Sequence, residues 1–543
     1  MKKTLLVLLS LFSMSAFAQI TDRERPAEWK NLVKGARHED RFEPMEGNVV
    51  KSDVWGCKNV VPRLVDNGIE MPGVSFWGGN IIKGEDGLYH MFVCGWPENS
   101  PRGHMFWSNS TVFHATSKTS HGPFKIVNHI GKGHNPEAFR LANGQWIVYT
   151  IDGYYHATDP NGIWWFSKFY FDKRDRKIIE GLSNLTFARR QDGSMLMICR
   201  GGGVWVSRDG VSDYHQISDS RVYPDVEGRF EDPVVWRDSV QYHLIVNDWL
   251  GRIAWYERSK DGLNWIVEPG EAYTINFTKH KDGTVEKWFK YERPKVLQDE
   301  YGRVEQMNFA VIDTIKWEDH PNDNHSSKNV CIPMNKGLLI SVLNNTRVTD
   351  KTKAIELLVR SEKGFDAQND LDIPSLRFGS YKEVNFGRGA KVIKTRKQGK
   401  DLVLVFKGKD TGIDSEEFAP KLLGQKKNGH MVFGYSKLPG VDYTPALVSS
   451  RRPVLAKDGK TVTVQVENYG LSASQPVKVK VMSSGVLVGE GEVPALKPYA
   501  AHNLLIKTDA QLGKNEDITF DVTLTSATQA KTTHFGVPEK KKK

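Results

Sequence analysis

The segment Glu231–Ile245, with the sequence EDPVVWRDSVQYHLI, decides the fold of this chain. It contains a short apolar strand, a polar turn and a second strand in which apolar and polar residues alternate, which is the pattern of a β-hairpin. Four other segments follow the same plan, and they begin at Gly78, His134, Ser183 and Glu292. Three of the five repeats continue into a third strand that ends in a turn. The repeated unit is therefore a small antiparallel sheet.

Successive repeats begin 48 to 61 residues apart. This period favours the four-stranded blades of a β-propeller over a sandwich. One such sheet cannot bury both of its faces, whereas a ring of sheets can. The repeats predict a five-bladed β-propeller over residues 19–362. We expect its fifth blade to be completed either by the chain up to about residue 360 or by N-terminal residues around Trp55.

Beyond residue 362 the repeats stop and the composition changes. Strand-like runs around a Gly-Lys turn predict an accessory β-sandwich over residues 363–450. Residues 451–537 include KTVTVQVENYG at 460–470, whose period of two predicts an immunoglobulin-like (Ig-like) sandwich. The predicted fold class is thus all-β, a propeller followed by one or two small sandwiches. The terminal lysine run, 538–543, is expected to be disordered.

The N-terminus has the features of a secretory signal peptide over residues 1–18. Lys2 and Lys3 precede the apolar stretch 5–12, and small residues at Ala16 and Ala18 suit cleavage before Gln19. The apolar run is too short to cross a bilayer, and no later segment is apolar enough to do so. We therefore expect the protein in the periplasm or outside the cell.

Charge and cysteine spacing exclude several classes of function. The formal net charge is +10, but Lys2, Lys3 and the four terminal lysines supply six of these charges and leave +4. Nothing resembles a nucleic-acid-binding motif. The four cysteines, Cys57, Cys94, Cys199 and Cys331, share no CxxC spacing, which argues against zinc. Cys94 and Cys199 lie in apolar strands, so buried free thiols are favoured over a disulfide. The chain contains no GxSxG, HExxH, Walker or GxGxxG motif.

Alignment of the five repeats places polar residues at the start of each innermost strand. Innermost strands line the axis of a propeller, so these side chains are expected to converge there, and convergent polar groups in one concavity indicate a ligand site. The alternative is that Asn and Asp cap turns and pair with Arg between blades. The aligned residues are Asn80, Asn135, Asn184, Asp232 and Arg293, preceded by Gly79, His134, Ser183, Glu231 and Glu292.

The motifs EDPVVW and HNPEAF, with the strands NGQWIVYT and GLYHMFV, resemble the five-bladed propeller glycoside hydrolases of families 43 and 117. The resemblance covers roughly residues 50–360 and implies cleavage of a sugar by carboxylates at the axis. Family 43 carries aspartates on its first two blades, as general base and as modulator of the pKa of the acid, where this chain has Asn80 and Asn135. A neutral amide cannot accept a proton from water. The acids would therefore lie on blades four and five.

Glycoside hydrolysis generally requires two carboxyl groups. Glu231 and Glu292 are the best pair, because they occupy equivalent positions on adjacent blades. We expect Glu231 to be the general acid and Glu292 the base or nucleophile. Asp232 either raises the pKa of Glu231 by like-charge repulsion or caps the strand. The alternative for Glu292 is a salt bridge with Arg293 or another axial arginine.

Other side chains are predicted to bind the substrate. His134 would act as acid, base or hydrogen-bonding group, although a lone histidine is more often structural. Arg200 and Arg293, with Arg102 and Arg189, would hold a carboxylate or sulfate on the sugar, unless each pairs with an acid between blades. The tryptophans predicted to stack on sugars or to pack between blades are Trp77, Trp96, Trp107 and Trp249.

Three function classes follow from these residues. A glycosidase is favoured by the pair Glu231 and Glu292, and a propeller that binds glycan without cleaving it by the Asn-for-Asp replacements. A polysaccharide lyase, with His134 or a tyrosine as base, is the third. The expected partner is an oligo- or polysaccharide, and the mild positive charge favours an acidic or sulfated one. No cofactor is expected to be required, although related propellers suggest a structural calcium or sodium ion at the axis.

Overall fold

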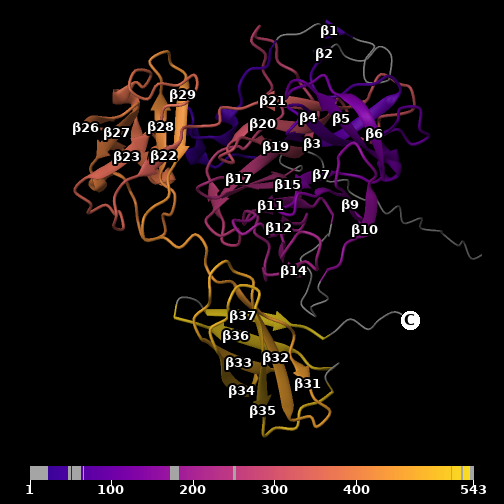
Figure 1. The fold of residues 1–543 in the computed structure, drawn as a ribbon, viewed down its shortest axis with the longest axis vertical. Helices are drawn as coiled ribbons and strands as arrows, with labels where there is room; N and C mark the ends of the chain where they lie inside the picture. The colour runs from indigo at the N-terminus through magenta and orange to yellow at the C-terminus, as the bar shows by residue number, and fades with distance from the viewer. Residues whose placement is uncertain are drawn as a thin grey trace, which may run out of the picture.

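The computed structural model describes residues 23–46, 50–51, 63–64, 66–171, 183–248, 252–514, 517–527 and 530–537. The predicted signal peptide, the terminal lysine run, Trp55, Cys57 and Trp249 lie outside these residues. Figure 1 shows three bodies built almost entirely of strands. Among the described residues, the structure has one α-helix, α1 (Tyr381–Val384), and no helix long and apolar enough to cross a membrane. The prediction of an all-β chain is confirmed.

Five antiparallel sheets follow one another between residues 74 and 333, and each consists of strands that are consecutive in the chain. The first contains β3 (Val74–Lys83), β4 (Tyr89–Pro97), β5 (Thr111–Ser117) and β6 (Lys125–Lys132), with η3 (Gly103–Asn109) between β4 and β5. The second contains β7 (Glu137–Arg140), β8 (Trp146–Tyr149), β9 (Gly153–Ala157) and β10 (Trp165–Lys168). The third contains β11 (Thr186–Arg189), β12 (Met195–Ile198), β13 (Val204–Ser207) and β14 (His215–Gln216). The fourth contains β15 (Phe230–Arg237), β16 (Tyr242–Asp248), β17 (Ile253–Ser259) and β18 (Ile266–Glu268), and the fifth β19 (Lys290–Gln298), β20 (Val304–Ile312) and β21 (Ser327–Pro333).

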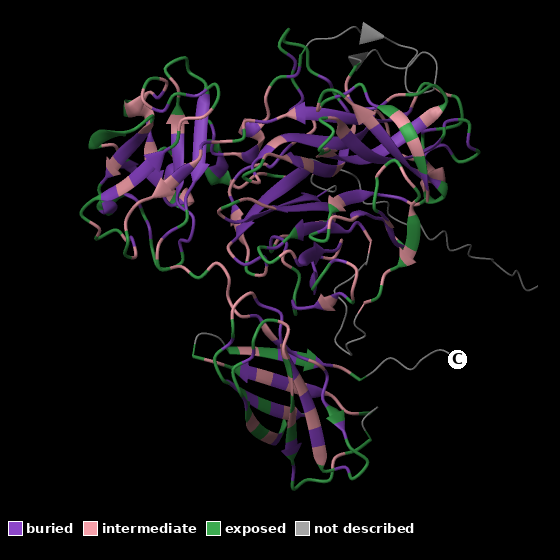
Figure 2. Cartoon of the chain, viewed as in Figure 1, coloured by how far each residue is buried: buried purple, intermediate pink, exposed green. Residues whose placement is uncertain are grey.

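The first strands of these sheets lie together at the centre of the body. Strand β3 contacts both β7 and β19, and β15 contacts both β11 and β19. The central strands are almost wholly buried, as Figure 2 shows, because each sheet packs its faces against its neighbours. The fold is therefore propeller-like, and the repeats found in the sequence correspond to its sheets. Cys94, Cys199 and Cys331 are buried, and within the described residues they form no disulfide, as predicted for the first two.

A segment from the N-terminus joins the fifth sheet. It begins with the short helices η1 (Ala27–Asn31) and η2 (His38–Arg41), after which Phe42 forms an antiparallel bridge with Met334. The backbone N–H of Glu43 donates to the carbonyl of Pro333 at 2.9 Å. This contact couples the start of the chain to the end of the fifth sheet. The pair β1 (Val50–Lys51) and β2 (Arg63–Leu64) forms a separate two-stranded sheet.

The second body consists of two four-stranded sheets around one apolar core. One sheet contains β22 (Ile340–Val342), β23 (Ile355–Val359), β27 (Asp401–Phe406) and β26 (Lys394–Gln398), and the other β25 (Ala390–Lys391), β24 (Arg377–Gly379), β28 (Lys421–Gln425) and β29 (Met431–Tyr435). The helices η4 (Ile373–Ser375), α1 and η5 (Gly408–Asp410) lie in its loops. Because β22 pairs with β23 and β23 pairs with β27, the propeller-like body ends before residue 340 and not at the predicted residue 362.

The third body also has two sheets that share a core. They contain β30 (Val448–Ser450), β31 (Val454–Leu455), β32 (Thr461–Asn468) and β35 (Ala501–Lys507), facing β34 (Val486–Val493), β33 (Val477–Ser483), β36 (Phe520–Thr525) and β37 (Ala530–Phe535). In β32 the valines at 462, 464 and 466 are buried and the residues between them are partly exposed. This alternation is the period of two that the sequence predicts.

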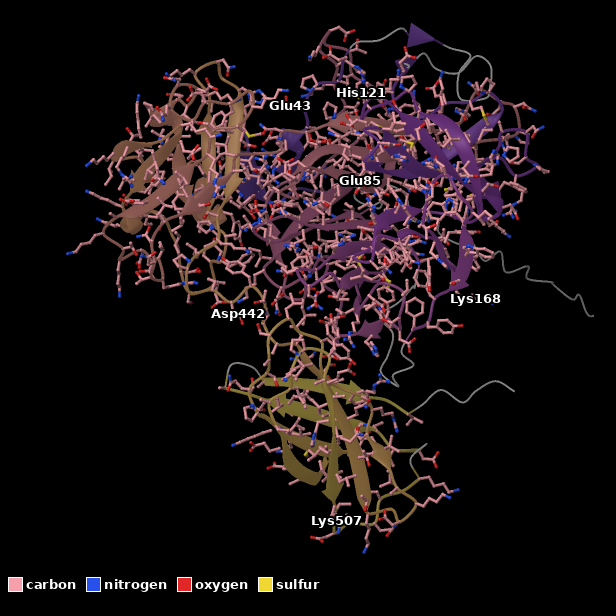
Figure 3. All side chains as sticks on the ribbon, viewed as in Figure 1. Glu43, Glu85, His121, Lys168, Asp442 and Lys507 are labelled. Carbon is pink, nitrogen blue, oxygen red and sulfur yellow. The ribbon has the colours of Figure 1, made fainter. Side chains whose placement is uncertain are left out.

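A buried ionic contact fixes the second body to the fourth sheet. Glu268 of β18 lies 2.5 Å from Arg258 of β17 and 3.8 Å from Lys421 of β28. Burial alone would raise the pKa of Glu268, but Arg258 and Lys421 lower it to about 2. Glu43, which Figure 3 places between the two bodies, adds a carboxylate 3.2 Å from His430. The propeller-like body and its neighbour are therefore joined by charges as well as by packing.

Candidate functional site

Equivalent residues of four sheets have left-handed backbone conformations near the start of the first strand. In β15 this position lies within a bulge, because Glu231 pairs with Asn247 and the next paired residue is Val234 with Ile245. A bulge re-aims a side chain out of the ladder. The residues concerned are Asn135 (φ 56°), Asn184 (φ 52°), Asp232 (φ 55°) and Arg293 (φ 52°).

The first sheet follows the same plan, but its register corrects the sequence alignment. The bulge of β3 lies between Trp77 and Asn80, so Gly78 (φ 69°) occupies the left-handed position and Trp77 the position of Glu231. Glycine adopts this conformation without steric cost. Asn80 lies two residues further along the strand. The prediction that Asn80 belongs to the same ring as Asn135 is therefore wrong.

Asn80 belongs to a second ring that joins neighbouring sheets. Its side-chain oxygen accepts a hydrogen bond from the backbone N–H of Ala138 at 2.8 Å. The equivalent Glu137 and Thr186 accept from Phe187 at 3.2 Å and Val235 at 3.1 Å. Each bond satisfies a buried backbone donor of the next sheet. Asn80 also lines a cavity of about 660 Å³ that the later parts of the first strands surround.

The left-handed ring contains an ionic network. The Arg293 guanidinium lies 2.9 Å from Asp232 Oδ1, which also accepts a hydrogen bond from the Asn184 amide at 3.1 Å, and Arg293 donates to Asn184 Oδ1. Burial raises the pKa of Asp232 to about 6 against the opposing effect of Arg293, and Glu292 and Glu231 add to the rise. Arg293 therefore pairs with an acid between sheets, the alternative to its predicted role in binding an anion.

Asn135 differs from the other members of this ring. Its side chain is buried, and neither atom of its amide has a hydrogen-bond partner among the described residues. A buried amide without partners is destabilising. Asn135 is thus the member of the ring whose side-chain amide forms no hydrogen bond with the described part of the protein.

Glu292 is the most strongly compensated carboxylate of the site. Its carboxylate forms ion pairs with Lys290 and Lys316, and its side chain is 2% exposed. Burial alone would raise the pKa of Glu292, but the two lysines hold it far below its ordinary value. The predicted alternative, a salt bridge with Arg293, is not what forms. Neither lysine was among the predicted site residues.

Glu231 is the carboxylate of the site that reaches solvent. Its side chain is 20% exposed, compared with 1% for Asp232 and 2% for Glu292. It lies 3.0 Å from Arg200, whose side chain is 34% exposed and comes from the turn after β12. The site thus contains four cationic side chains and three carboxylates. We call it the axial cluster and define it as Glu231, Asp232, Glu292, Arg200, Lys290, Arg293 and Lys316.

His134 and Trp77 occupy positions equivalent to Glu231, on the second and first sheets. His134 lies 2.9 Å from Ser110 Oγ, and its ring packs near Trp107, with centroids 4.8 Å apart. Burial, then the nearby Arg293, lowers the pKa of His134 well below its ordinary value. His134 is therefore neutral at neutral pH and a weak proton acceptor, and its ring can serve as a hydrogen-bonding group.

Trp77 has no free ring face in this structure. It is 1% exposed, the Lys316 ammonium lies 4.9 Å from its ring centroid, and His104 contacts it edge-on at 4.6 Å. The prediction that Trp77 stacks on a sugar is corrected, because Lys316 occupies the stacking position. Trp96 is also buried, and Trp107 is the described tryptophan near His134 that stays partly exposed. Arg102 and Arg189 are exposed and form none of the ion pairs of the axial cluster.

No protein-family model matches the sequence, and no curated protein matches it. Solved structures with a similar arrangement include a family 117 glycoside hydrolase from Zobellia galactanivorans (10% identity over 54% of this chain and 89% of that chain, TM-score 0.38). An endo-arabinase from Bacteroides thetaiotaomicron matches at 12% identity over 48% and 94% (TM-score 0.31), and the family 43 protein BlXynB from Bacillus licheniformis at 10% over 86% and 89% (TM-score 0.33). These neighbours share 10% to 12% identity with this chain.

Proposed function

We propose that this protein is a glycosidase whose catalytic carboxylates are Glu231 and Glu292. In this proposal the five sheets are the blades of a five-bladed β-propeller, the second body is an accessory sandwich and the third is Ig-like. The observation that carries the proposal is the contrast between the two acids. They occupy equivalent positions on adjacent sheets, yet Glu231 reaches solvent while Glu292 is buried and held ionised by two lysines.

The environment of Glu292 favours one of its two predicted roles. A carboxylate whose pKa is held so low is a weak proton acceptor, so general-base catalysis by Glu292 is disfavoured. An ionised carboxylate can still attack the anomeric carbon or stabilise the oxocarbenium-like charge that develops there. We infer that Glu292 is the nucleophile or charge stabiliser, and that Glu231 delivers the proton to the leaving oxygen.

Asp232 would act on its neighbours and not on the sugar. Its side chain is 1% exposed and one of its oxygens is engaged by Arg293 and Asn184. It also has the pKa of about 6 that lets it hold a proton at mildly acidic pH. We propose that Asp232 keeps Arg293 in place at the axis. The sequence predicted that Asp232 either raises the pKa of Glu231 or caps the strand. In the structure, Glu231 raises the pKa of Asp232.

The substrate we propose is a plant or algal glycan that carries carboxylate or sulfate groups. The axial cluster has one more cationic side chain than carboxylates, and Arg200 is the most exposed of them. A bidentate anion is a good partner for a guanidinium. An anionic substituent that binds Arg200 would release Glu231 from its ion pair. Export to the periplasm or beyond the cell remains part of this proposal.

A second candidate, glycan binding without cleavage, is favoured by a specific observation. Each carboxylate of the axial cluster is paired with a cation of the protein itself. Such a cluster recognises a charged ligand even where it transfers no proton.

The experiment that separates the candidates uses the purified protein with panels of neutral, uronate-containing and sulfated oligosaccharides. Release of reducing ends by the wild type, lost in both Glu231→Gln and Glu292→Gln, supports hydrolysis. Products that absorb in the ultraviolet indicate a lyase. Binding without any product would contradict the enzyme and support the second candidate. Glu300→Gln, an exposed carboxylate in the turn between β19 and β20, is the matched control.

A further inference from the structure

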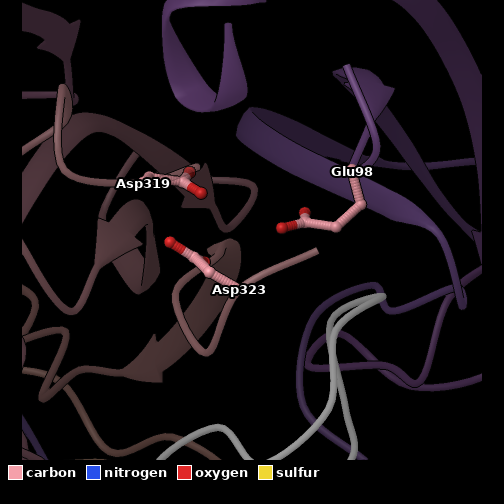
Figure 4. A group of neighbouring side chains, drawn as sticks. All are labelled: Glu98, Asp319 and Asp323. Carbon is pink, nitrogen blue, oxygen red and sulfur yellow. The ribbon is translucent and has the colours of Figure 1, made fainter. Parts of the chain in front are cut away.

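Three carboxylates that the axial cluster does not include converge between the first and fifth sheets. We call Glu98, Asp319 and Asp323 the acidic cluster. Glu98 follows β4, and the two aspartates lie in the loop between β20 and β21. Each offers one carboxylate oxygen, and these oxygens lie within 4.8 Å of one another. Figure 4 shows the three side chains directed toward a common space.

Asp319 is buried without the partners that a buried carboxylate needs. It is 2% exposed, and neither of its oxygens has a hydrogen-bond partner among the residues that the structure describes. The backbone N–H of His104 faces it and weakly favours its ionised form, but does not reach hydrogen-bond geometry. Buried charges in proteins are paired or bind metals. Asp319 is therefore an unused ligand directed into the cluster.

The other two carboxylates are oriented by hydrogen bonds that leave ligand positions open. Glu98 Oε2 accepts from the hydroxyls of Ser75 and Ser326, while Glu98 Oε1 has no hydrogen-bond partner in the described ranges of the chain. Asp323 accepts the backbone N–H groups of His320 at 2.8 Å and His325 at 2.7 Å. Such outer contacts are what fixes the direction of metal ligands.

The charges that face the acidic cluster are negative. Asp323 and Asp313 both raise the pKa of Glu98 and of Asp319. His325 is drawn toward Asp313, at 3.4 Å. Within the described part of the chain, no lysine, arginine or histidine forms an ion pair with Glu98, Asp319 or Asp323. The described residues thus gather negative charge here and pair no cation with it.

Backbone packing holds this arrangement together. Gly103 has φ 51°, and a Cβ atom at this position would lie 1.7 Å from the carbonyl oxygen of Asp319. Only glycine lets η3 approach the loop so closely. The loop also carries Lys316, which contacts Glu292 and the ring of Trp77.

We propose that the acidic cluster is a calcium site that fixes the β20–β21 loop. All three ligands are carboxylates, the hard oxygen donors that calcium prefers. Two oxygens bound to one Ca²⁺ are at most about 5 Å apart, given bond lengths of about 2.3–2.6 Å. The oxygens here meet that limit. Magnesium requires shorter bonds and near-ideal octahedral geometry, so it is the natural comparison ion. The bound ion would hold Lys316 against Glu292, which makes the acidic cluster a positioning element for the axis.

The test is calcium binding by the whole protein after it is stripped with a chelator. Calorimetric titration with CaCl₂ is expected to show one site, with a Kd between about 10⁻⁶ and 10⁻³ M. Asp319→Asn and Asp323→Asn are expected to weaken binding by at least about 100-fold. Glu318→Gln, which removes the same charge beside the site, is the matched control and should bind as the wild type does. Glu318 accepts a hydrogen bond from Thr314 and is not part of the cluster.

Two further readouts keep the test independent of catalysis. Calcium should raise the melting temperature of the wild type and of Glu318→Gln, but not of Asp319→Asn. It should also slow hydrogen exchange of the backbone amides of residues 313–325. A wild type that binds no calcium up to about 5 mM, well above the Kd expected for such sites, overturns the proposal. Binding that both aspartate variants retain overturns it as well.

Discussion

The axial cluster and the acidic cluster are both groups of carboxylates in the same propeller-like body, but they are compensated in opposite ways. At the axis, Glu231, Asp232 and Glu292 each pair with an arginine or with lysines. In the acidic cluster, Glu98, Asp319 and Asp323 face one another and Asp313. At the axial cluster the protein supplies the positive charge that its carboxylates need. At the acidic cluster we propose that a bound cation supplies it.

The largest effect is expected when the compensated carboxylates are removed. Glu292→Gln and Glu231→Gln should each lower kcat/KM by about 10²–10⁴-fold, the usual contribution of a group that transfers a proton or attacks the sugar. Steady-state kinetics on the best oligosaccharide would measure this. The control is Glu300→Gln, and an unchanged kcat/KM in either active-site variant would show that the axial pair is not the catalytic one.

A smaller effect is expected when one cation of the axial cluster is removed. Lys316→Met takes one of the two ammonium groups from Glu292, so the pKa of Glu292 should rise toward its ordinary value. A folded-state pKa below the unfolded one stabilises the protein above the unfolded pKa. The variant should therefore lose about 1.5–3 kcal/mol at neutral pH, as charged hydrogen bonds contribute. Denaturant unfolding at pH 7 measures the loss, and Lys336→Met, which removes an exposed lysine paired with Asp299, is the comparison.

The pH dependence of stability should reveal the uncompensated acidic cluster. Burial and like charges raise the pKa of Asp319 to about 8 and that of Glu98 to about 7. Both folded-state pKa values lie above the unfolded ones. The two carboxyl groups therefore make their full contribution to the free energy of unfolding below about pH 4, and this contribution is lost as the pH rises toward 8. Without calcium, Asp319→Asn should therefore stabilise the protein by about 1–3 kcal/mol at pH 8 and by little at pH 4.

Thermal unfolding of chelator-treated protein across this pH range is the measurement. Added calcium should reduce the difference between the wild type and Asp319→Asn at pH 8. A variant that is less stable than the wild type at pH 8 without calcium would contradict the picture of unpaired charge.

The smallest effect compares two asparagines of the left-handed ring. Both have positive φ, but Asn184 bonds Asp232 and Arg293, whereas Asn135 has no hydrogen-bond partner among the described residues. Glycine relieves the backbone strain at either position, by about 1 kcal/mol. Asn135→Gly should raise stability, and Asn184→Gly should lower it because the network is lost. If Asn135 binds the sugar, its variant will also have a higher KM. Equal changes in the free energy of unfolding for the two variants would contradict this difference between Asn135 and Asn184.

The sequence predicted the sheets better than the site. Hairpin signals such as the Asp-Gly and Asn-Gly turns repeat locally, so the five sheets and the alternation of β32 could be read from the residues alone. The chain's entry into the fifth sheet at Phe42 could not, because it depends on a contact between residues nearly 300 positions apart. The boundary at residue 362 was also missed, since β23 pairs with β27, which begins only at Asp401.

Within the site, errors arose where a bulge or a loop intervenes. Two adjacent glycines hide the register of β3, so Asn80 was aligned with Asn135 although Gly78 is its equivalent. Lys290 could have been found, because residues i and i+2 of a strand share a face and it lies two positions before Glu292. Lys316 and the acidic cluster could not have been found in this way. The loop between β20 and β21 brings their side chains to partners far away in the sequence, and no local pattern of residues indicates such contacts.

The central claim is that the axial carboxylates hydrolyse a glycosidic bond. The most direct measurement is mass spectrometry of products formed from the best oligosaccharide in H₂¹⁸O. With the wild type, each new reducing end is expected to carry one oxygen from the labelled water, and neither Glu231→Gln nor Glu292→Gln is expected to form such products. Unlabelled products, or labelled products that both variants still form at the wild-type rate, would contradict it.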